Sequence, residues 1–526
     1  MNNPILPGSY PDPSVCRVGD DYYLVTSTFE WFPGVPIFHS RDLVNWRQLG
    51  HVLDRPSQLE LDGIRPSGGI YAPTIRHHDG VFYMITTLVD GQVTEGNFVV
   101  TATDPAGPWS DPHWLPEAEG FDPSLFFDDD GRVWVTGTRP AKPLEYEGQT
   151  EIWLRELDLA TMALTGPEHV IWGGALRGAI WSEGPHLYKV DGLYYLLTAE
   201  GGTAHDHAVV VARSDRIAGP YTGNPRNPVL THRHLGRDHP IVGTGHADLV
   251  RTPPGEWWMV LLAMRPHDGY TLNLGRETFL APVRWEDGWP VVPAVPPALT
   301  PPALPEHRWP AEPACDHFDS VRLAHCWNHL RTPREPYWSL TDRPGHLRLR
   351  LRPESLTDLA SPSFVARRLR HRDFAAFTVV DFTPDGPGQC AGLALVQNHD
   401  HLILLVTAGD EVRVVRREGG VEEVLAAEPA RPGRLYLGVE AHGQEYRMRC
   451  AAEAGEWRPL GDVVDGRVLC MAATGGFTGA YVGMYASSNG TASAAVADFD
   501  WFEYAGLSPS APAFSGRRLG GSASLR

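Results

Sequence analysis

Apolar and polar residues alternate in five similar segments along the first part of the chain. The clearest copy has an apolar run at 121–127, a tight turn at Asp130-Gly131 and a second alternating run at 133–135. Alternation with a period of two around an Asp-Gly turn is typical of a β-hairpin. Each copy carries a marker near the start of its first run, and these markers are Pro13, Pro73, Pro123, Pro185 and Ala247.

The spacing of these markers predicts the fold. They are 60, 50, 62 and 62 residues apart, which leaves room for two further strands after each hairpin. A repeat of about four strands is typical of a propeller blade, so five copies predict a five-bladed β-propeller over residues 1–292. The alternative is a β-sandwich, whose hairpins recur more closely and without a repeated motif.

The second part of the chain has a different pattern. Prolines crowd residues 293–313, which is typical of a stiff linker. Short alternating runs such as 346–351 and 377–382 follow, and they predict a β-sandwich over 314–505, which we expect to be a concanavalin-like jelly roll. Residues 506–526 are rich in Ser, Gly, Ala and Pro and are expected to form a tail that is partly disordered or lies on the surface. We therefore expect an all-β chain.

Composition and charge narrow the range of functions. A chain of 526 residues is too long for one hydrophobic core, so two or more domains are expected. The formal net charge of -19 argues against a nucleic-acid partner, because nucleic acids are held mainly by Lys and Arg. The longest apolar run, 257–264, is too short to cross a bilayer, and the first residues lack the features of a signal peptide, so we expect a cytoplasmic protein without a membrane partner. The six cysteines form no CxxC pair and are expected to be free thiols.

The repeats also bring candidate catalytic residues together. In a propeller the innermost strands surround a central channel, so equivalent positions of different blades converge near its mouth. The position before the marker is, in order of the five copies, Asp12, Ala72, Asp122, Gly184 and His246. Glu183 lies one residue earlier in the fourth copy, so three acids and a histidine are expected around one axis.

Paired carboxyls in a cleft suit hydrolysis of a glycosidic bond. One carboxyl must be protonated to donate to the leaving oxygen, and the other must be ionised to activate water. A third carboxylate can raise the pKa of the acid by like-charge repulsion. The alternative for Asp12 and Asp122 is a structural cap, because Asp-Pro commonly starts a turn, and Glu183 could be an exposed side chain. The one-residue offset of Glu183 also leaves its direction open, since side chains alternate along a strand and only a local bulge would turn it toward the aspartates.

The motifs around these residues resemble glycoside hydrolase family 43, especially the β-xylosidases and α-L-arabinofuranosidases that carry a C-terminal β-sandwich. The resemblance covers residues 4–505. The matching segments are Tyr10-Pro11-Asp12-Pro13-Ser14, Phe32-Pro33-Gly34-Val35-Pro36-Ile37, Ser40-Arg41-Asp42-Leu43-Val44-Asn45-Trp46, Gly69-Ile70-Tyr71-Ala72-Pro73, Phe121-Asp122-Pro123-Ser124 and Ser182-Glu183-Gly184-Pro185.

The resemblance implies a role for each acid. It makes Asp12 the general base, Glu183 the general acid and Asp122 the residue that tunes and orients Glu183. Such enzymes invert the anomeric configuration in a single displacement. Because a water molecule must fit between base and acid, we expect a separation of roughly 6.5 to 9.5 Å between the carboxyls of Asp12 and Glu183.

The next expectations concern polar contacts to the substrate and possible ion sites. The resemblance places His246 and Arg276 in the substrate pocket and implies that Arg276 donates to sugar hydroxyls. It also places His246 on the central axis, where relatives often hold a calcium ion through a histidine and waters, although the chemistry itself requires no cofactor. The alternative for His246 is a histidine satisfied within the core. Asp498 and Asp500, near the last strand, could bind a structural ion, but we expect them to face solvent.

Aromatic residues are expected to shape the pocket. The resemblance assigns Phe29, Trp31, Phe32 and Tyr71 to apolar walls for a sugar face, although any one of them could be plain core. Many xylosidase relatives have Trp where this chain has Tyr71, so the choice of sugar stays open. Phe477 lies in a segment that resembles a loop narrowing the site to a pocket, which implies exo action; the alternative for Phe477 is ordinary sandwich core.

These observations lead to one function and two rivals. We expect an inverting exo-glycosidase that releases terminal xylose from β-1,4-xylo-oligosaccharides. The rival within the same class is an α-L-arabinofuranosidase, or an enzyme with both activities. The rival from another class is a carbohydrate-binding protein without turnover, which would not need three converging carboxyls. The expected partner is a small oligosaccharide, and assembly into a homo-oligomer is left open.

Overall fold

The structure is a computed structural model that describes residues 3–507. The chain divides into two compact units, Met1–Pro310 and Ala311–Arg526, and each is described by itself. Nearly all regular elements are strands, which confirms the predicted all-β class. The tail expected at 506–526 lies, beyond Leu507, outside the described residues.

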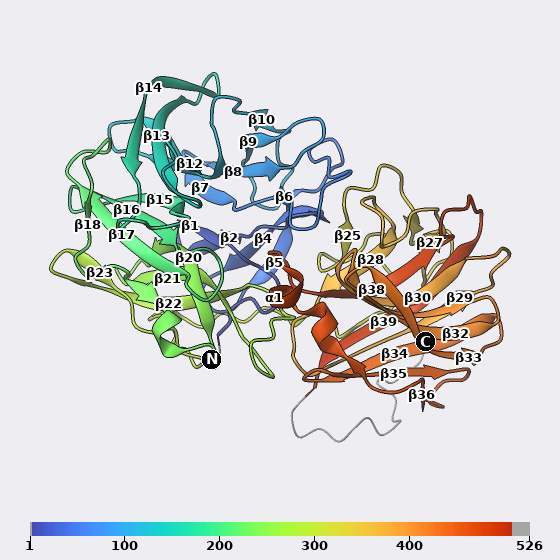
Figure 1. Ribbon diagram of the computed structural model, residues 1–526. Helices are drawn as coiled ribbons and strands as arrows, with labels where there is room; N and C mark the ends of the chain where they lie inside the picture. Colours follow the sequence, from blue (N-terminus) through green and yellow to red (C-terminus); the bar gives the residue numbers. More distant parts are fainter. Residues whose placement is uncertain (1–2, 508–526) are drawn as a thin grey trace. The chain divides into compact units, whose positions relative to one another are not determined.

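Five antiparallel sheets make up the first unit, which confirms the predicted five-bladed β-propeller (Figure 1). The first blade contains β1 (Ser14–Val18), β2 (Asp21–Val25), β4 (Gly34–Ser40) and β5 (Arg47–Leu53), with β3 (Trp31–Phe32) between β2 and β4 in sequence. The second contains β6 (Gly69–Ile70), β7 (Thr74–His78), β8 (Val81–Val89), β9 (Gly96–Ala102) and β10 (His113–Trp114). The third contains β11 (Phe121–Phe127), β12 (Val133–Pro140), β13 (Thr150–Asp158) and β14 (Ala163–Trp172).

The last two blades follow the same plan. The fourth contains β15 (Glu183–Val190), β16 (Leu193–Glu200), β17 (Ala208–Ser214), β18 (Thr222–Gly223) and β19 (Leu230–Thr231), followed by the short helix η1 (Arg233–Leu235). The fifth contains β20 (Val242–Arg251), β21 (Trp257–Met264), β22 (Glu277–Glu286) and β23 (Trp289–Val291). In every blade the first long hairpin is one of the five repeated segments of the sequence.

The turns of these hairpins have the backbone that their residues favour. Asp79 and Gly80 have φ of 48° and 79°, and Asp191 and Gly192 have φ of 50° and 82°. Two consecutive residues at positive φ are typical of a type I′ turn, which matches the right-handed twist of the flanking strands and prefers Asp-Gly. In these two hairpins the local sequence therefore favours the observed tight turn. At Asp130-Gly131 only the glycine has positive φ, at 85°.

The innermost strands form a closed ring. β1 contacts β7 and β20, β11 contacts β7 and β15, and β15 contacts β20. The N-terminal segment joins the last blade to the first, because the amide of Leu6 donates to the carbonyl of Thr278 (3.2 Å) and the side chain of Asn3 donates to the carbonyl of Leu280 (2.9 Å). This closure fixes the equivalent positions of the blades around one axis.

The first strands of three blades are bulged next to the marker positions. The pairing of β11 shifts between Phe121 and Ser124, and that of β15 shifts between Glu183 and His186. A bulge bends the strand and changes the direction of its side chains. The residue before the marker has positive φ in four copies, with values of 55° at Asp12, 52° at Asp122, 58° at Gly184 and 43° at His246.

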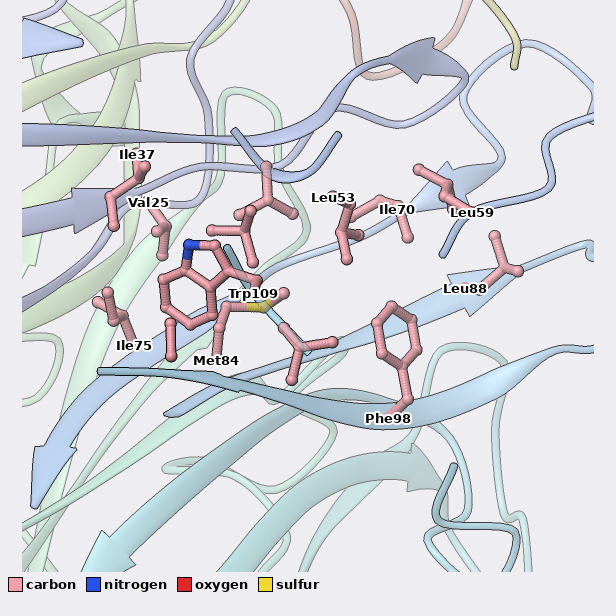
Figure 2. Close-up of a cluster of buried hydrophobic side chains, with 14 of the residues drawn as sticks. Val25, Ile37, Leu53, Leu59, Ile70, Ile75, Met84, Leu88, Phe98 and Trp109 are labelled. Atoms are coloured by element: carbon pink, nitrogen blue, oxygen red, sulfur yellow. The ribbon is translucent and has the colours of Figure 1, made fainter. Parts of the chain in front are cut away.

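Apolar side chains fill the space between neighbouring blades. Figure 2 shows one such cluster, in which Val25 and Ile37 of the first blade face Met84 and Phe98 of the second, with Trp109 among them. These side chains are almost fully removed from water. Since burying a side chain of this size contributes about 1.5–3 kcal/mol, the contacts between blades hold the inner strands in place.

The second unit contains two antiparallel sheets and confirms the predicted β-sandwich. The first has the order β26-β27-β39-β29-β34-β35-β36, with β24 on β39 and β37 on β35; the second has the order β25-β28-β38-β30-β31-β32-β33. The strands are β24 (Cys315–Asp316), β25 (Asn328–Leu330), β26 (Trp338–Ser339), β27 (Leu347–Arg350), β28 (Ser363–Arg368), β29 (Phe374–Phe382), β30 (Cys390–Asn398), β31 (His401–Ala408), β32 (Glu411–Glu418), β33 (Val421–Pro429), β34 (Gly433–His442), β35 (Glu445–Ala451), β36 (Arg458–Pro459), β37 (Val464–Asp465), β38 (Tyr481–Ser487) and β39 (Val496–Gly506). Two short helices, η2 (Gly466–Leu469) and α1 (Met471–Thr474), precede β38.

Side-chain placement departs from expectation at Asp498. Its carboxylate is buried and accepts from the guanidinium of Arg348 at 2.7 Å, so the expectation that it faces solvent is wrong. Asp500 is paired with Arg434. All six cysteines are free. Within residues 3–507, no helix is long and apolar enough to cross a membrane.

Candidate active site

Asp12 lies just before β1 and is buried among donors. Its carboxylate accepts from the hydroxyl of Ser27 (2.5 Å) and from Nη1 of Arg276 (3.1 Å), and Oδ1 lies 3.7 Å from Nδ1 of His246. Burial alone would raise the pKa of Asp12, but the Arg276 guanidinium, His246 and the Ser27 hydrogen bond outweigh burial and hold this pKa below its usual value. Asp12 is therefore an ionised carboxylate at neutral pH.

The pKa values of Asp122 and Glu183 are shifted in the opposite direction, above their usual values. The amide of Gly184 donates to Oδ2 of Asp122 at 3.2 Å. Burial, followed by repulsion from Glu183 and Asp12, raises the pKa of Asp122 well above its usual value. Burial and repulsion from Asp12 raise the pKa of Glu183 to about 8, although Arg276 opposes the rise. The site therefore holds a protonated carboxyl beside an ionised one at neutral pH.

The imidazole of His246 explains why Glu183 is offset by one residue. A Cβ atom added at Gly184 would lie 2.9 Å from Cε1 of His246, which is closer than carbon atoms pack. The fourth blade therefore has glycine where the first and third blades have Asp12 and Asp122. Its acid comes from the preceding residue, and the bulge at the start of β15 resolves the question of strand parity that the sequence left open.

Arg276 contacts both the carboxylate of Asp12 and the ring of Phe29. Its Nη1 also donates to the hydroxyl of Thr203 at 2.9 Å, and its guanidinium carbon lies 5.3 Å from the ring centre of Phe29. The rings of Phe29 and Tyr71 meet edge to face at 5.4 Å. Phe32 is buried within the apolar cluster of the first two blades. The substrate contacts assigned to these four residues stay predictions.

A second polar layer lies one step further along the inner strands. Asp248 is fully buried and accepts from Nη1 of Arg76 (2.9 Å), the hydroxyl of Ser14 (2.7 Å) and the hydroxyl of Tyr188 (2.5 Å). Nη2 of Arg76 also donates to Nδ1 of His186 at 2.9 Å. Although burial opposes it, the Arg76 guanidinium holds the pKa of Asp248 far below its usual range.

This layer is built from the same strands as the acidic one. The residues after the five markers are Ser14, Thr74, Ser124, His186 and Asp248. Ser14 follows Asp12 by two positions, and Ser124 follows Asp122 by two. Ser124 lies 3.2 Å from Nδ1 of His186, so the strands that carry the acids are tied together through this layer.

Several residues of the site were not predicted from the sequence. Ser27 and Thr203 hold Asp12 and Arg276, and His207 lies close enough to His246 and Asp12 to interact electrostatically with both. Burial lowers the pKa of His207 to about 3, so it is neutral. Its Nδ1 lies 3.2 Å from the carbonyl of Gly243. The only available signal was the Glu-Gly-Gly-Thr segment that ends at Thr203, because a turn with two adjacent glycines positions its neighbours closely.

The calcium expectation concerns His246. Calcium prefers six to eight oxygen ligands. In the part of the chain that the structure describes, no three His, Cys, Asp or Glu side chains are grouped so that they could hold a metal ion. Oδ1 of Asp12, the nearest carboxylate oxygen to His246, already accepts from Arg276. The residues do not fit a calcium site made of protein ligands; an ion held mainly by water stays a prediction, and no step below depends on it.

Phe477 belongs to the second unit, where it follows α1 and is half-buried. Its proposed contribution to the pocket stays a prediction. The separation expected between the carboxyls of Asp12 and Glu183 also stays a prediction.

A pair of neighbouring carboxyls, one protonated and one ionised, is typical of enzymes that hydrolyse glycosidic bonds. The family model for glycosyl hydrolases family 43 matches residues 1–290, and the model for the β-xylosidase C-terminal concanavalin A-like domain matches residues 315–505. The chain belongs to glycoside hydrolase family 43, and it is a glycoside hydrolase.

Characterised relatives match over almost the whole chain. A xylosidase/arabinosidase of Butyrivibrio fibrisolvens is 46% identical over 514 residues, which cover 95% of this chain and 98% of the relative. A non-reducing end α-L-arabinofuranosidase of Bacteroides ovatus is 41% identical and covers 96% of this chain and 94% of the relative. The crystal structure of a xylan β-1,4-xylosidase from Bacillus halodurans has a TM-score of 0.90 at 41% identity and covers 96% of this chain and 99% of that one.

Proposed function

We propose that this enzyme releases terminal xylose from the non-reducing ends of β-1,4-xylo-oligosaccharides, with inversion at the anomeric carbon. The observation that carries the proposal is the opposite protonation of two neighbouring carboxyls, the buried Asp12, which is ionised, and the partly buried Glu183, which is protonated. Single displacement requires this combination, because the base must accept a proton from water while the acid donates one to the leaving oxygen.

In the proposed reaction, Asp12 accepts a proton from a water molecule as the water oxygen attacks the anomeric carbon. The bond from that carbon to the glycosidic oxygen breaks, and Glu183 donates its proton to this oxygen. Arg276 keeps Asp12 oriented, and burial together with the charge of Asp12 keeps the pKa of Glu183 high. Asp122 is proposed to orient Glu183, and its Oδ2 accepts from the amide of Gly184 next to the acid. Proton transfer through water returns both carboxyls to their starting states.

Inversion is tested by following the anomer that first appears. Proton NMR during hydrolysis of p-nitrophenyl β-D-xyloside should show α-xylose before mutarotation. Initial release of β-xylose would contradict single displacement and would indicate a covalent intermediate.

An α-L-arabinofuranosidase, or an enzyme with both activities, is the second candidate. It is favoured by the names of the Butyrivibrio and Bacteroides relatives and by Tyr71, a departure from the Trp of many xylosidases. The two p-nitrophenyl glycosides, compared by kcat/KM, separate the candidates. A higher kcat/KM on the α-L-arabinofuranoside would replace the xylosidase proposal.

A further inference from the structure

Tyr71 lies between two aromatic rings beside the carboxyls of the site. Its ring meets that of Phe29 edge to face at 5.4 Å and that of Phe121 edge to face at 6.5 Å. Phe121 directly precedes Asp122 in the chain, and Tyr71 also interacts electrostatically with the Asp122 carboxyl. Edge-to-face pairs at these distances favour one orientation of the ring. The ring of Tyr71 is therefore held close to the proposed catalytic residues.

The backbone at Tyr71 is fixed by hydrogen bonds on both sides. The amide of Tyr71 donates to the carbonyl of Thr87 at 3.0 Å, and the hydroxyl of Thr86 donates to the carbonyl of Tyr71 at 3.0 Å. The preceding residue, Ile70, exchanges two backbone hydrogen bonds with Phe29, at 2.9 and 3.1 Å. The position of the phenol hydroxyl therefore depends on the side chain of Tyr71 and on its polar partners.

A charged pair lies at the hydroxyl end of Tyr71. Nε of Arg65 lies 2.7 Å from Oδ2 of Asp90, and Arg65 also forms a hydrogen bond with the hydroxyl of Tyr71. Arginine has only donors, so the phenol oxygen is the acceptor in this bond. Burial raises the pKa of Tyr71 although Arg65 opposes the rise, so the phenol is uncharged at neutral pH. Asp90, Arg65 and Tyr71 thus form one continuous polar chain.

The backbone positions the two charged residues of this chain. Gly69 of β6 pairs with Val89 of β8. Arg65 precedes β6 and Asp90 directly follows β8, so the antiparallel pairing brings both to the same end of the two strands. Their side chains are 54% and 37% exposed, and ion pairs so exposed contribute little to stability. A Cβ atom added at Gly68 would lie 2.8 Å from Oδ2 of Asp90, so glycine leaves the space that this carboxylate occupies.

We propose that Arg65, anchored by Asp90, determines the sugar preference of the enzyme by fixing the hydroxyl of Tyr71. The inference rests on the proposed hydrolase function and on the prediction that Tyr71 contacts the sugar, and it adds the residues that position this side chain. A xylopyranoside and an arabinofuranoside present their hydroxyls at different positions, because one ring has six members and the other has five. A hydroxyl held in one place meets the two sugars unequally, and a site that hydrogen-bonds one sugar discriminates against the other.

The test is a double-mutant cycle read on two substrates. For Arg65→Met, Tyr71→Phe and the double variant, kcat/KM is measured on p-nitrophenyl β-D-xyloside and on p-nitrophenyl α-L-arabinofuranoside. Both single variants should change the ratio of the two kcat/KM values in the same direction, by about three- to tenfold. The double variant should change the ratio no further, because each single variant already breaks the same contact. Loss of folded enzyme lowers both values equally and leaves the ratio unchanged.

Arg132→Met is the matched control, because Arg132 and Asp130 form an ion pair whose side chains are 49% and 45% exposed, away from Tyr71. Its ratio should stay at the wild-type value. An unchanged ratio in either single variant would show that this hydroxyl does not determine sugar preference, and additive changes in the double variant would show that Arg65 acts apart from Tyr71. If the wild-type enzyme cleaves neither glycoside, the proposed function fails and this inference fails with it, whereas wild-type turnover confines any failure to Arg65.

Discussion

The propeller has two polar layers on the same inner strands, and the two layers differ in their balance of negative and positive side chains. In the acidic layer, Asp12, Asp122 and Glu183 all interact with the guanidinium of Arg276. In the inner layer, a single carboxylate, Asp248, is matched by one guanidinium, Arg76. Asp12, Asp122 and Asp248 are all buried, and Glu183 is partly buried, so the clearest difference between the layers is the ratio of negative to positive groups.

This difference distinguishes the layer that is proposed to perform the reaction from the layer that stabilises the inner strands. The carboxylate of Asp248 has partners on both oxygens, so its proton is lost and its position is fixed. In the acidic layer one cation cannot neutralise three acids, so two of them keep raised pKa values. Groups poised to exchange protons at neutral pH are those that catalysis needs. The inner layer holds the strands so that the acidic layer can remain unbalanced.

The largest effect is expected at Glu183, the proposed general acid. Glu183→Gln keeps the shape of the side chain but removes the transferable proton, so kcat should fall by about 10³-fold or more on substrates with poor leaving groups. Steady-state kinetics on xylobiose measure this, with the exposed Glu453→Gln as the matched control. Wild-type activity of Glu183→Gln would remove Glu183 as the acid.

The next effect concerns the inner layer and is expected in stability. Arg76→Met leaves the Asp248 carboxylate buried without its cation, which should cost about 3–5 kcal/mol of unfolding free energy. The double variant Arg76→Met with Asp248→Asn removes both charges and should recover part of that loss. Urea unfolding of the two variants measures the recovery.

Arg132→Met is the control, because Arg132 forms an exposed ion pair with Asp130, and such pairs contribute about 1 kcal/mol or less. A loss in Arg76→Met no larger than in this control would contradict the view that the inner layer supports the fold.

The two layers should also respond to pH with opposite signs. Glu183 has a folded pKa of about 8, above its unfolded value of about 4.3, so its favourable contribution is present at low pH and is lost as pH rises toward 8. Asp248 has a lowered folded pKa, so its contribution is present above about pH 3.9 and is lost as pH falls.

Thermal unfolding between about pH 2.5 and 8 separates the two cases, because the contribution of Asp248 changes only below about pH 3.9. Relative to the wild type, Glu183→Gln should gain Tm as pH rises, and Asp248→Asn should lose most Tm at the upper end. Parallel Tm curves for both variants would show that the layers do not differ in charge balance.

The smallest effect is expected from a single hydroxyl of the inner layer. Tyr188→Phe removes a donor to Asp248 and an acceptor for the amide of Leu249, which should cost about 1–3 kcal/mol in stability while kcat/KM changes little. Tyr194→Phe removes a donor to Asp128, whereas Tyr188→Phe removes both a donor to a carboxylate and an acceptor for a backbone amide, so Tyr194→Phe should cost less. A large fall in kcat/KM with unchanged stability would place Tyr188 in the acidic layer instead.

Most of the fold prediction rested on the five repeated hairpin segments in the first part of the chain. Five markers at similar spacing were enough to predict five blades and to select Asp12, Asp122 and Glu183, because closure of a propeller brings equivalent positions together. The direction of Glu183 could not be predicted, since it depends on a bulge and on the space that His246 occupies. These are properties of the packing between blades.

Other features depended on pairs that are distant in sequence. Arg76 and Asp248 are separated by 172 positions, and nothing local identifies either as the partner of the other. Asp498 alternates with apolar residues as an exposed strand position would, yet Arg348 on the neighbouring strand buries and pairs it.

The pH dependence of kcat/KM tests the central claim most directly, because it reports the pKa values of the acid and the base in the free enzyme. Measured on xylobiose, the profile should lose activity on the alkaline side near pH 8, as Glu183 deprotonates, and on the acid side only below the usual range of aspartate, as Asp12 becomes protonated. An alkaline limb near pH 4.5, the value of an ordinary glutamate, would contradict the claim that an unbalanced acidic layer keeps the catalytic proton on Glu183.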